Sequence, residues 1–393
     1  MVSFLEAKNI VKGFARSFGK EQVYLDDALG RVLAENIFAD RDYPPFNRSA
    51  MDGFAVRKED IDKGINKFKV IDTIYAGGTT DKVQSPGECY KIMTGAAVPA
   101  SSNIVIRIED TELINGQVSF NTTQIKAYQN IACRGEDVKS GTMVLSSSLV
   151  ITPSIIGVLA TLGMHQVLIE KLPSVAIITT GDEVVDPGSN VGDVEIRNSN
   201  LPVLKAFFKK WNIIPSYCHH APDNVGALRN ALEKALAFDI VVVSGGVSAG
   251  DADHVPEVLN ELGVEKLFHK VAIKPGKPVW CGHKKRKQMV FALPGNPFSC
   301  IVTFKLFIES YLNSCFGVAT IDLMLLLKDE RKQRVRLDEF FPVRISGSPA
   351  QLTSVSLNGS GDIRLAHEAD ALALHPASKS VLQAGEVILV VAL

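Results

Sequence analysis

Residues 239–254 of the chain read DIVVVSGGVSAGDADH, and this stretch decides the fold. Its first part, Asp239 to Ser244, is an uninterrupted apolar run rich in β-branched residues, which is typical of a parallel strand buried on both faces. A glycine-rich segment follows it, and a helix is predicted from His254 to Leu262. A buried strand, a glycine-rich loop and a helix in this order indicate an α/β domain.

The same alternation of strands and helices extends to both sides of this stretch. Further strands are predicted at residues 174–180, 213–219 and 288–293, and further helices at residues 201–211, 223–238 and 297–315. Such units give a doubly wound sheet with right-handed crossovers, which binds ligands at the carboxyl ends of its strands. The segments expected at those ends contain GDE (181–183), SGGVSAGDAD (244–253) and LPGNP (293–297). The pattern therefore predicts a site at this edge of the sheet.

The flanking segments predict further domains. Residues 40–141 are rich in Gly, Pro and Thr with short β-like runs, which favours an inserted β domain. A helix at 153–162 is expected to pack with an N-terminal helix at 4–18, and short strands with glycine turns after residue 318 favour a small β-barrel. The predicted fold is multidomain α/β, with a helical domain (1–39 and 142–172), an inserted β domain (40–141), a doubly wound domain (173–318) and a C-terminal barrel (319–393).

Composition excludes several classes of protein. The net charge of −1 over 393 residues gives no basic surface for nucleic acid. No apolar run is long enough to cross a membrane and no signal peptide is evident at the N-terminus, so we expect a cytoplasmic protein. The six cysteines form no C-x-x-C pair, which favours free thiols over zinc ligands or disulfides.

The glycine-rich loop predicts an anion site. Glycines let backbone amides approach an anion, and the N-terminus of the next helix adds a favourable partial charge. Asp251 and Asp253 are close enough in sequence to share a hard cation with a phosphate. The alternative is a glycine-rich turn with an acidic helix cap.

Two more segments have candidate anion ligands. Residues 270–278, KVAIKPGKP, place three lysines beside a Pro-Gly turn, which suits a small oxyanion, although solvated surface lysines are the alternative. Residues 293–299, LPGNPFS, join a strand to a helix, so that amides and Ser299 could bind an anion or simply begin the helix. The run Lys284 to Lys287 is expected to be an exposed hairpin loop.

The glycine-rich loop also matches G-x-S-x-G at residues 246–250, the nucleophile elbow of serine hydrolases. That motif needs Ser248 on a sharp turn from strand to helix. Here the strand is expected to end near Ser244 and the helix to begin near His254, and the histidines lack a convincing acidic partner in the later sequence. A serine hydrolase using Ser248 is therefore the weaker interpretation.

Together and in order, seven segments resemble the MoeA family, whose eukaryotic relatives include the gephyrin E domain. They are PPFNRSAMDGFAV (44–56), KIMTGAAVP (91–99), QNIACRGEDV (129–138), TTGDEV (179–184), SGGVSAGDADH (244–254), AIKPGKP (272–278) and LPGNPFS (293–299). The resemblance implies a helical domain, an inserted β domain, a MogA/MoaB-like α/β domain and a C-terminal β-barrel.

The resemblance also implies an activity, that of a molybdopterin molybdenumtransferase. Such an enzyme inserts molybdate into adenylated molybdopterin with release of AMP, depends on Mg²⁺, and receives its substrate from a MogA-like adenylyltransferase. It further implies a homodimer in which the insert of one subunit faces the α/β domain of the other. The alternative from another class is a non-catalytic scaffold like gephyrin, although no receptor-binding linker is recognisable.

The resemblance assigns roles to residues of this chain. The catalytic positions are Asp52, Thr94, Asp137, Glu183, Asp223, Asp253, Lys270 and Lys274; the molybdate positions are Lys274, Lys277, Ser299, Pro294 and Pro297; the metal positions are Glu183 and Asp253. For Asp223, a helix-capping role is the alternative. One departure concerns an arginine that many relatives carry two residues after an E-F pair: here Pro342 stands in that place, and Arg344 or Ser360 is expected to substitute.

Overall fold

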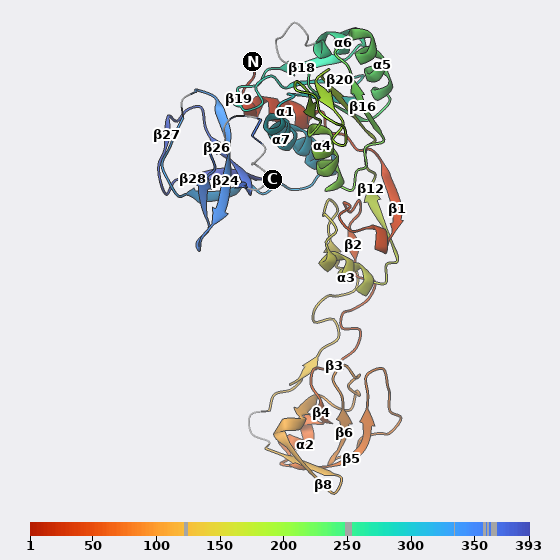
Figure 1. Cartoon of the computed structure of the whole chain (residues 1–393). Helices are drawn as coiled ribbons and strands as arrows, with labels where there is room; N and C mark the ends of the chain where they lie inside the picture. Colours follow the sequence, from red (N-terminus) through yellow and green to blue (C-terminus); the bar gives the residue numbers. More distant parts are fainter. Residues whose placement is uncertain (122–124, 248–253, 334, 357–358, 360, 363–367) are drawn as a thin grey trace. The chain divides into compact units, whose positions relative to one another are not determined.

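The computed structural model describes residues 1–121, 125–247, 254–333, 335–356, 359, 361–362 and 368–393. The chain divides into two compact units. Unit 1 comprises Met1–Ala34, Ser148–Ala160 and Met164–Leu393, and unit 2 comprises Glu35–Ser147 and Thr161–Gly163. Figure 1 shows the elements of both units coloured along the chain.

A mixed sheet forms the centre of unit 1. Its strands run in the order β16-β13-β17-β21-β20-β18, of which β16, β13, β17 and β21 are mutually parallel, while β20 and β18 are antiparallel to their neighbours. The strand bounds are β13 Val175–Thr180, β16 Tyr217–Ala221, β17 Ile240–Ser244, β18 Glu265–His269, β20 Trp280–Lys284 and β21 Gln288–Leu293. Because β16 and β17 lie on opposite sides of β13, the chain reverses its winding direction at β13–β17, where such sheets bind ligands.

Helices cover both faces of this sheet (Figure 1). Their bounds are α1 Phe4–Gly13, α4 Asn200–Lys209, α5 Val225–Ala235, α6 Val255–Glu261, α7 Pro297–Thr303, the π-helical turn η3 Phe304–Ile308 and α8 Glu309–Phe316. Alternate strand residues pack on opposite faces: Ile240 and Val242 lie in the cluster with α4, α7 and α8, and Val241 and Val243 lie in the cluster with α5 and α6. The unbroken apolar run of β17 is thus explained by burial on both sides.

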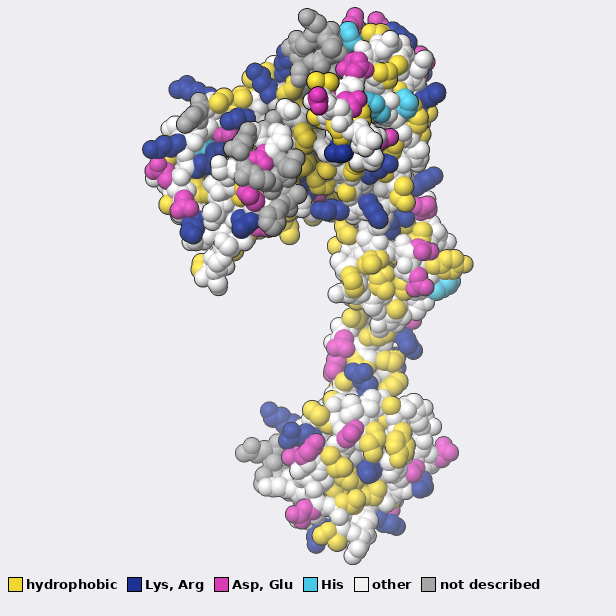
Figure 2. Space-filling model, viewed as in Figure 1, with side chains coloured by type: hydrophobic (Ala, Val, Ile, Leu, Met, Phe, Trp, Pro, Cys, Tyr) yellow, Lys and Arg dark blue, Asp and Glu magenta, His cyan; other side chains and the backbone are white. Residues whose placement is uncertain are grey.

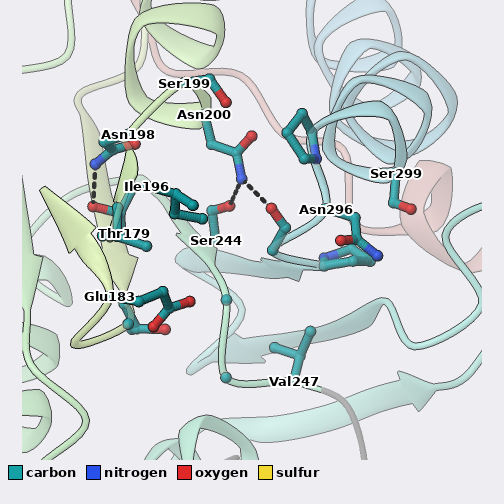
Figure 3. Close-up of a pocket in the computed structure, with 18 of the residues that line it drawn as sticks. Thr179, Glu183, Ile196, Asn198, Ser199, Asn200, Ser244, Val247, Asn296 and Ser299 are labelled. Carbon is teal, nitrogen blue, oxygen red and sulfur yellow. Dashed lines mark hydrogen bonds between the residues drawn. The ribbon is translucent and has the colours of Figure 1, made fainter. Parts of the chain in front are cut away.

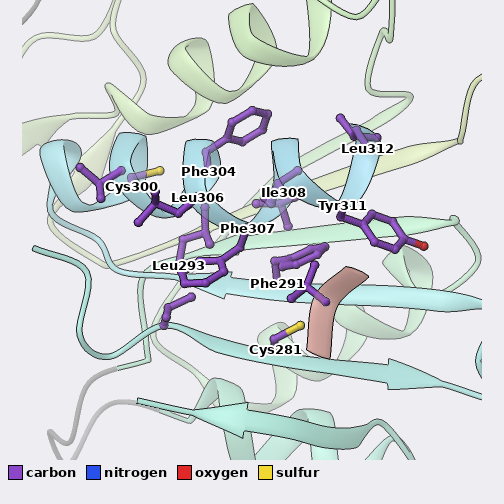
Figure 4. Close-up of a cluster of buried hydrophobic side chains, with 14 of the residues drawn as sticks. Cys281, Phe291, Leu293, Cys300, Phe304, Leu306, Phe307, Ile308, Tyr311 and Leu312 are labelled. Atoms are coloured by element: carbon purple, nitrogen blue, oxygen red, sulfur yellow. The ribbon is translucent and has the colours of Figure 1, made fainter. Parts of the chain in front are cut away.

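The core on the α7–α8 face is aromatic. Figure 4 shows Phe307 and Tyr311 on the side of the helix that faces the sheet residues Phe291 and Leu293. Phe304 points to the other side and packs against Phe207 and Phe208 of α4. Full burial of each such ring contributes about 1.5–3 kcal/mol relative to exposure. This packing holds helix α7 and its N-terminal loop firmly against the end of β21.

The N-terminal helix belongs to this same core. Helix α1 begins at a capping box, in which Glu6 N donates to Ser3 Oγ and Ser3 N donates to Glu6 Oε2. Its buried face packs against α8 and η3, whereas the sequence predicted a helix to residue 18 that packs with the helix at 153–162. The predicted domain boundaries stay a prediction, because the division into two units does not separate those domains.

The segment that follows α1 reaches the later part of the chain through a β ladder. Strand β1 pairs with β12 in antiparallel register from Lys20↔Glu170 to Tyr24↔Gln166. The remaining elements of this part are β1 Lys20–Tyr24, η1 Leu25–Asp27, α3 Pro153–Thr161, β12 Gln166–Glu170, β14 Val184–Val185 and β15 Ile196–Arg197.

The C-terminal part of unit 1 is a closed barrel. Strands β24, β25, β22, β28 and β26 follow one another around it, and the β24–β26 pairing closes the ring, which confirms the predicted barrel. The bounds are β19 Ile273–Lys274, β22 Leu323–Leu327, β23 Arg331–Lys332, β24 Asp338–Ser346, β25 Gln351–Ser354, β26 Ala371–His375, β27 Val381–Leu382 and β28 Val387–Ala392. Short β19 pairs with β24 and so joins the lysine turn to the barrel.

Unit 2 is the predicted β-rich insert. Its main sheet has the order β7-β4-β6-β5-β9-β8. The bounds are β2 Ile37–Phe38, β3 Arg48–Ser49, β4 Gly53–Val56, α2 Lys58–Asp62, β5 Lys67–Ile74, β6 Glu88–Ile92, β7 Ile104–Arg107, η2 Ile108–Asp110, β8 Thr111–Ile114, β9 Gln117–Phe120, β10 Ile131–Ala132 and β11 Met143–Leu145. Phe54, Phe68 and Phe120 lie in its core.

The multidomain α/β fold class is confirmed, with some local differences. The strand predicted at 213–219 begins only at Tyr217, because Asn212 has a φ of 58° in the preceding turn and Pro215 lacks an N–H to donate. The predicted hairpin loop at Lys284 to Lys287 is confirmed, since β20 and β21 pair on either side of it. The helix predicted at 297–315 is present, interrupted by η3.

Charges of both signs are interspersed over the surface. On the face that Figure 2 shows, Lys, Arg, Asp and Glu alternate over each unit and no large patch of one sign is visible. This agrees with the net charge of −1. Among the described residues, no helix combines the length and the apolar character that crossing a membrane requires.

Candidate functional site

A cavity of about 420 Å³, here called pocket 1, lies at the carboxyl ends of the parallel strands. Its walls are the loops after β13, β17 and β21, together with the start of α4. The residues that line it are Thr179, Thr180, Gly181, Glu183, Val184, Ile196, Arg197, Asn198, Ser199, Asn200, Asp223, Ser244, Gly245, Gly246, Val247, Pro278, Pro294, Gly295, Asn296, Pro297 and Ser299. The predicted edge of the sheet therefore carries a cavity.

The glycine after β17 is required by its conformation. Gly245 has a φ of +106°, and a Cβ there would lie 2.4 Å from Thr180 Oγ1 and 3.1 Å from Thr180 O. Its N–H donates to Leu293 O at 3.0 Å, which ties the loops after β17 and β21 together. The backbone can approach its neighbours this closely only without a side chain.

A chain of buried and partly buried hydrogen bonds orients the first wall of pocket 1. Asn198 Nδ2 donates to Thr179 Oγ1 at 2.9 Å, as Figure 3 shows, and Thr179 Oγ1 lies 3.0 Å from His220 Nδ1. His220 Nε2 lies 3.0 Å from Gly181 O, and because a carbonyl can only accept, this nitrogen carries the proton. His220 Nδ1 then accepts from Thr179. These hydrogen bonds therefore fix the backbone of Gly181, where the loop after β13 begins.

A second set of bonds fixes the opposite wall. Asn200 Nδ2 donates to Ser244 Oγ at 2.9 Å and to Gly295 O at 2.6 Å, so it connects the loops after β17 and β21 (Figure 3). Cys300 lies behind Ser244, at 3.9 Å from its Oγ. Burial raises the pKa of the Cys300 thiol to about 12, so it is inert as a nucleophile.

Two carboxylates line pocket 1, Glu183 and Asp223. Asp182 N donates to Asp223 Oδ2 at 3.4 Å, and Asp223 N donates to Asp182 Oδ1 at 3.0 Å, so two neighbouring loops hold each other. The possible capping role of Asp223 is wrong: Asn224 caps α5 by accepting from Gly226 N and Ala227 N. The side chain of Asp223 is thus available to the pocket.

Oxygen ligands of this kind suit a hard divalent cation. Mg²⁺ is typically held by one or two carboxylates together with the phosphates of a substrate, and Glu183 and Asp223 provide such a donor set. Within the described ranges, no group of three or more His, Cys, Asp or Glu side chains forms a metal cluster by itself. Asp251 and Asp253, together with Ser248 of the hydrolase interpretation, lie outside the described residues.

A larger cavity of about 690 Å³, pocket 2, lies between the lysine turn, the start of α7 and the barrel. Lys274 and Lys277, the predicted molybdate ligands, line it, and so does Glu339 of the barrel. Lys274 Nζ lies 3.0 Å from Glu339 Oε1, and Arg331 Nη2 lies 3.1 Å from Glu339 Oε2. Burial acts to raise the pKa of Glu339, but the hydrogen bond from Lys274 and the charge of Arg331 outweigh it and lower that pKa.

The two pockets adjoin. Pro278 and Ser299 line both of them. Gly276 allows the lysine turn to lie this close to α7: its φ is +98°, and a Cβ would lie 2.6 Å from Thr303 Cγ2. Two ligands, one in each cavity, can therefore be bound next to each other across Ser299.

The structure brings together a part of the predicted site. Glu183, Asp223, Pro294, Pro297 and Ser299 line pocket 1, and Lys274, Lys277 and Ser299 line pocket 2. Lys270 is not among the described residues that line either cavity; its backbone bonds to Val2 and Val279, with a φ of 67°. Its role stays a prediction.

Three predicted positions belong to unit 2. Thr94 donates to Asp52 Oδ1 from its N–H at 2.7 Å and from its hydroxyl at 2.8 Å. These two bonds lower the pKa of Asp52, so this carboxylate is charged and fixed. Asp137 is exposed, and its N–H donates to Tyr43 O at 3.1 Å. The roles of all three stay predictions.

Sequence reasoning missed several polar residues at both cavities. Asn198, Asn200 and His220 lie outside the recognised segments, and Thr179, although it begins the segment TTGDEV, was not among the predicted site residues. Arg331 of pocket 2 lies outside the recognised segments, and Glu339 was noted only as part of the E-F pair. A signal existed only for the asparagines, since polar residues directly before a helix that starts at a strand end often face the ligand.

Comparison with known proteins gives consistent matches along the chain. Residues 2–163 match the family described as MoeA N-terminal region (domain I and II), and residues 176–314 match a probable molybdopterin binding domain. A molybdopterin molybdenumtransferase of Staphylococcus epidermidis is 32% identical over 99% of this chain and 92% of its own length. One of Staphylococcus aureus is 33% identical over 93% and 89%. A solved structure of a molybdopterin biosynthesis MoeA protein from Pyrococcus horikoshii is 31% identical with a TM-score of 0.81, covering 100% of this chain and 99% of its own.

Proposed function

The chain belongs to the MoeA family, and from this premise we propose that it is a molybdopterin molybdenumtransferase of molybdenum-cofactor biosynthesis. One observation supports this most: an acidic cavity at the sheet edge adjoins a cationic cavity across Ser299. A reaction between a pyrophosphate-containing substrate and a separate oxyanion needs two such sites side by side.

Pocket 1 is assigned to adenylated molybdopterin. The N–H of Gly246 and the polar side chains of Asn200 and Ser244 offer donors and acceptors at the strand ends, where nucleotides bind in such sheets. Glu183 and Asp223 would hold Mg²⁺ against the pyrophosphate. When bound there, Mg²⁺ would neutralise charge on the phosphate oxygens and favour departure of AMP.

Pocket 2 is assigned to molybdate. Lys274 and Lys277 approach the cavity from a turn whose shape Gly276 fixes, and the ammonium groups attract a dianion. Because the pockets share Ser299, the oxyanion would lie beside the dithiolene of the neighbouring substrate. Positioning of this kind can supply a large part of a rate enhancement without any covalent step on the protein.

The assignment is tested by AMP release from adenylated molybdopterin, prepared with a MogA-like adenylyltransferase, with molybdate and Mg²⁺ present. Glu183→Gln removes a charge that lines pocket 1, and we expect AMP release to fall at least a hundredfold with an unchanged melting temperature. Glu233→Gln, an exposed position of α5, is the matched control and should behave as wild type. Wild-type rates from the Glu183 variant would overturn the assignment, whereas a scaffold without activity would release no AMP in any variant.

The unit 2 residues and the homodimer complete the proposal. Asp52→Ala and Glu183→Ala proteins should each be inactive alone. If the insert of one subunit serves the site of the other, subunit exchange gives heterodimers with one doubly altered and one intact site, and random pairing restores about a quarter of all sites. Exchange confirmed by mass but without recovery of AMP release would contradict the shared site.

A further inference from the structure

Pocket 2 has an arginine that the sequence did not predict. Pro342, which stands in the place of the family's arginine, lines the cavity and supplies no charge. Arg344 lies two residues, about 7 Å, further along β24 and is not among the described lining residues. Arg331 of β23 does line the cavity.

Three groups fix the guanidinium of Arg331. Its Nη2 lies 3.1 Å from Glu339 Oε2, and its Nη1 lies 2.9 Å from His375 Nδ1. Its Cζ lies 3.9 Å from the centre of the Phe341 ring, within the range of a cation–π contact. The side chain is only 18% exposed, so few other conformations are open to it.

His375 has a defined role in this arrangement. Arginine can only donate, so His375 Nδ1 accepts from it, and Nε2 carries the proton and donates to Lys379 O at 3.0 Å. The ring is fully buried, and with Nδ1 accepting from Arg331 and Nε2 carrying the proton it is the neutral form that fits these contacts. It fixes one edge of the guanidinium while the Glu339 carboxylate fixes another.

Within the described part of the chain, Glu339 and His375 are the hydrogen-bonding partners given for the guanidinium of Arg331. A guanidinium has five N–H groups, and the bonds to Glu339 and His375 engage only a part of them. Among the described lining residues, Lys274, Lys277 and Arg331 oppose the single carboxylate of Glu339, which leaves an excess of two positive charges. That excess matches a tetrahedral dianion. Phe298 and Phe340 line the same cavity and give it apolar walls, beside which electrostatic interactions are stronger than in bulk water.

From this geometry we propose that Arg331 is the arginine of the oxyanion site in pocket 2, and that His375 and Glu339 are its positioning residues. The inference rests on the assignment of molybdate to pocket 2. It replaces the expectation that Arg344 or Ser360 substitutes for the missing arginine. Ser360 itself lies outside the described residues.

The test measures how the full chain depends on molybdate. Arg331→Gln should raise the molybdate concentration for half-maximal AMP release about ten- to a hundredfold, the usual effect of a lost charge-assisted contact. The rate at saturating molybdate and the binding of adenylated molybdopterin should stay near wild type. Arg331→Lys should recover a part of the loss, because it keeps the charge without the planar fork.

Control variants separate Arg331 from its neighbours. Arg336→Gln, an exposed arginine that lines a different cavity of the barrel, should leave the molybdate dependence unchanged. His375→Leu should raise the half-saturating concentration about two- to tenfold, and His375→Gln, whose amide oxygen can accept from Arg331, should restore most of it. A purely structural role of His375 would lower the melting temperature in both variants and leave the molybdate dependence unchanged.

The outcomes distinguish the two proposals. An active wild type whose molybdate dependence is unchanged by Arg331→Gln, or changed only by Arg344→Gln, would overturn the inference while the proposed function stands. A wild type that neither binds molybdate in calorimetry nor releases AMP would overturn the proposed function itself. Melting temperatures of all variants show that each one is folded.

Discussion

The two adjoining cavities are built in different ways. Pocket 1 is formed by loops that follow β13, β17 and β21, so its residues come from the ends of neighbouring strands of one sheet. Pocket 2 combines a turn near residue 276 with barrel residues more than fifty positions later. A site at strand ends follows from the order of elements in the chain, whereas a site between two packed parts depends on how they meet.

The two cavities also differ in how they hold charge. In pocket 1 the two carboxylates of Glu183 and Asp223 outnumber the one cation, Arg197, so binding of a pyrophosphate there calls for a metal cation as partner. In pocket 2 the protein supplies the cations itself and balances them with Glu339. Changes in one cavity should therefore alter one substrate's binding and leave the other's intact.

The largest effect is expected at the backbone of pocket 1. Gly245→Ala puts a Cβ 2.4 Å from Thr180 Oγ1 at a φ of +106°, which costs about 1–3 kcal/mol of strain before any clash. We expect the melting temperature to fall by about 2–4 °C for each kcal/mol of strain and AMP release to be lost. Gly188→Ala, where a Cβ meets nothing within 4 Å and φ is not positive, is the control. Equal melting temperatures of Gly245→Ala and Gly188→Ala would contradict the prediction, because they would show that the loop after β17 accommodates a Cβ at residue 245.

The next effect separates the pockets. Gly276→Ala, at a φ of +98° with a Cβ 2.6 Å from Thr303 Cγ2, should displace the lysine turn. Half-saturating molybdate should then rise about tenfold or more, because the charge-assisted contacts of Lys274 and Lys277 are misplaced. Equilibrium binding of adenylated molybdopterin should not change. Weaker nucleotide binding with unchanged molybdate dependence would mean that the two assignments are reversed.

A smaller effect is expected in pocket 1, on binding of the nucleotide substrate instead of molybdate. Asn200→Ala removes the bonds to Ser244 Oγ and Gly295 O, which connect two loops of pocket 1. Loss of these bonds should weaken binding of adenylated molybdopterin about tenfold and leave half-saturating molybdate unchanged. Calorimetry with the nucleotide substrate measures the first, and the rate assay the second. An effect on molybdate alone would contradict the separation.

The smallest effect concerns pH and the barrel. Burial lowers the pKa of His375 below its ordinary value of 6.5, so the folded chain resists its protonation more than the unfolded chain does. The stability from this group is present above pH 6.5 and is lost as the pH falls toward the lowered pKa. The facing groups are Arg331, Glu339, Glu386 and the Lys379 carbonyl. Unfolding between pH 7 and 5.5 should show this loss, since Glu339 and Glu386 have lowered pKa values and remain charged there.

The His375→Gln variant provides the reference for that experiment. It keeps an acceptor for Arg331 but has no group that titrates in this range, so its melting temperature should vary less with pH than that of the wild type. An identical pH dependence in both proteins would show that other histidines cause it.

Much of pocket 1 could be predicted from the order of residues alone. The apolar run Ile240–Ser244 requires burial on both faces, and Gly245 and Gly246 after it require a loop at the strand's carboxyl end. Glu183 and Asp223 both line pocket 1 because each follows a strand of the same parallel set. The capping alternative for Asp223 was wrong by one residue, because the helix cap is Asn224. Asp and Asn are both good N-caps, so the sequence could not choose between them. The structure decides, because Asn224 has the extended backbone conformation of an N-cap.

Pocket 2 was only half predictable. The sequence identified Lys274 and Lys277 from the local Pro-Gly turn, but its candidates for the arginine were Arg344 and Ser360, both sought close to the family's motif. Arg331 is found only after the barrel closes, because the bonds to His375 and Glu339 and the ring of Phe341 bring β23 against β24 and β26.

The sequence by itself determined the class of fold, the family, the edge of the sheet that carries pocket 1, and the local turns that need glycine. Those properties depend on residue order and on backbone conformations that only glycine adopts readily, and both can be read over short spans of chain. Tertiary structure alone decided that Pro278 and Ser299 belong to both cavities, that α1 packs in the sheet's core, and that Arg331 and Glu339 face Lys274. These are contacts between residues far apart in the chain. Because the free energy of burying apolar surface is non-directional, it does not specify such contacts until whole helices and strands pack together.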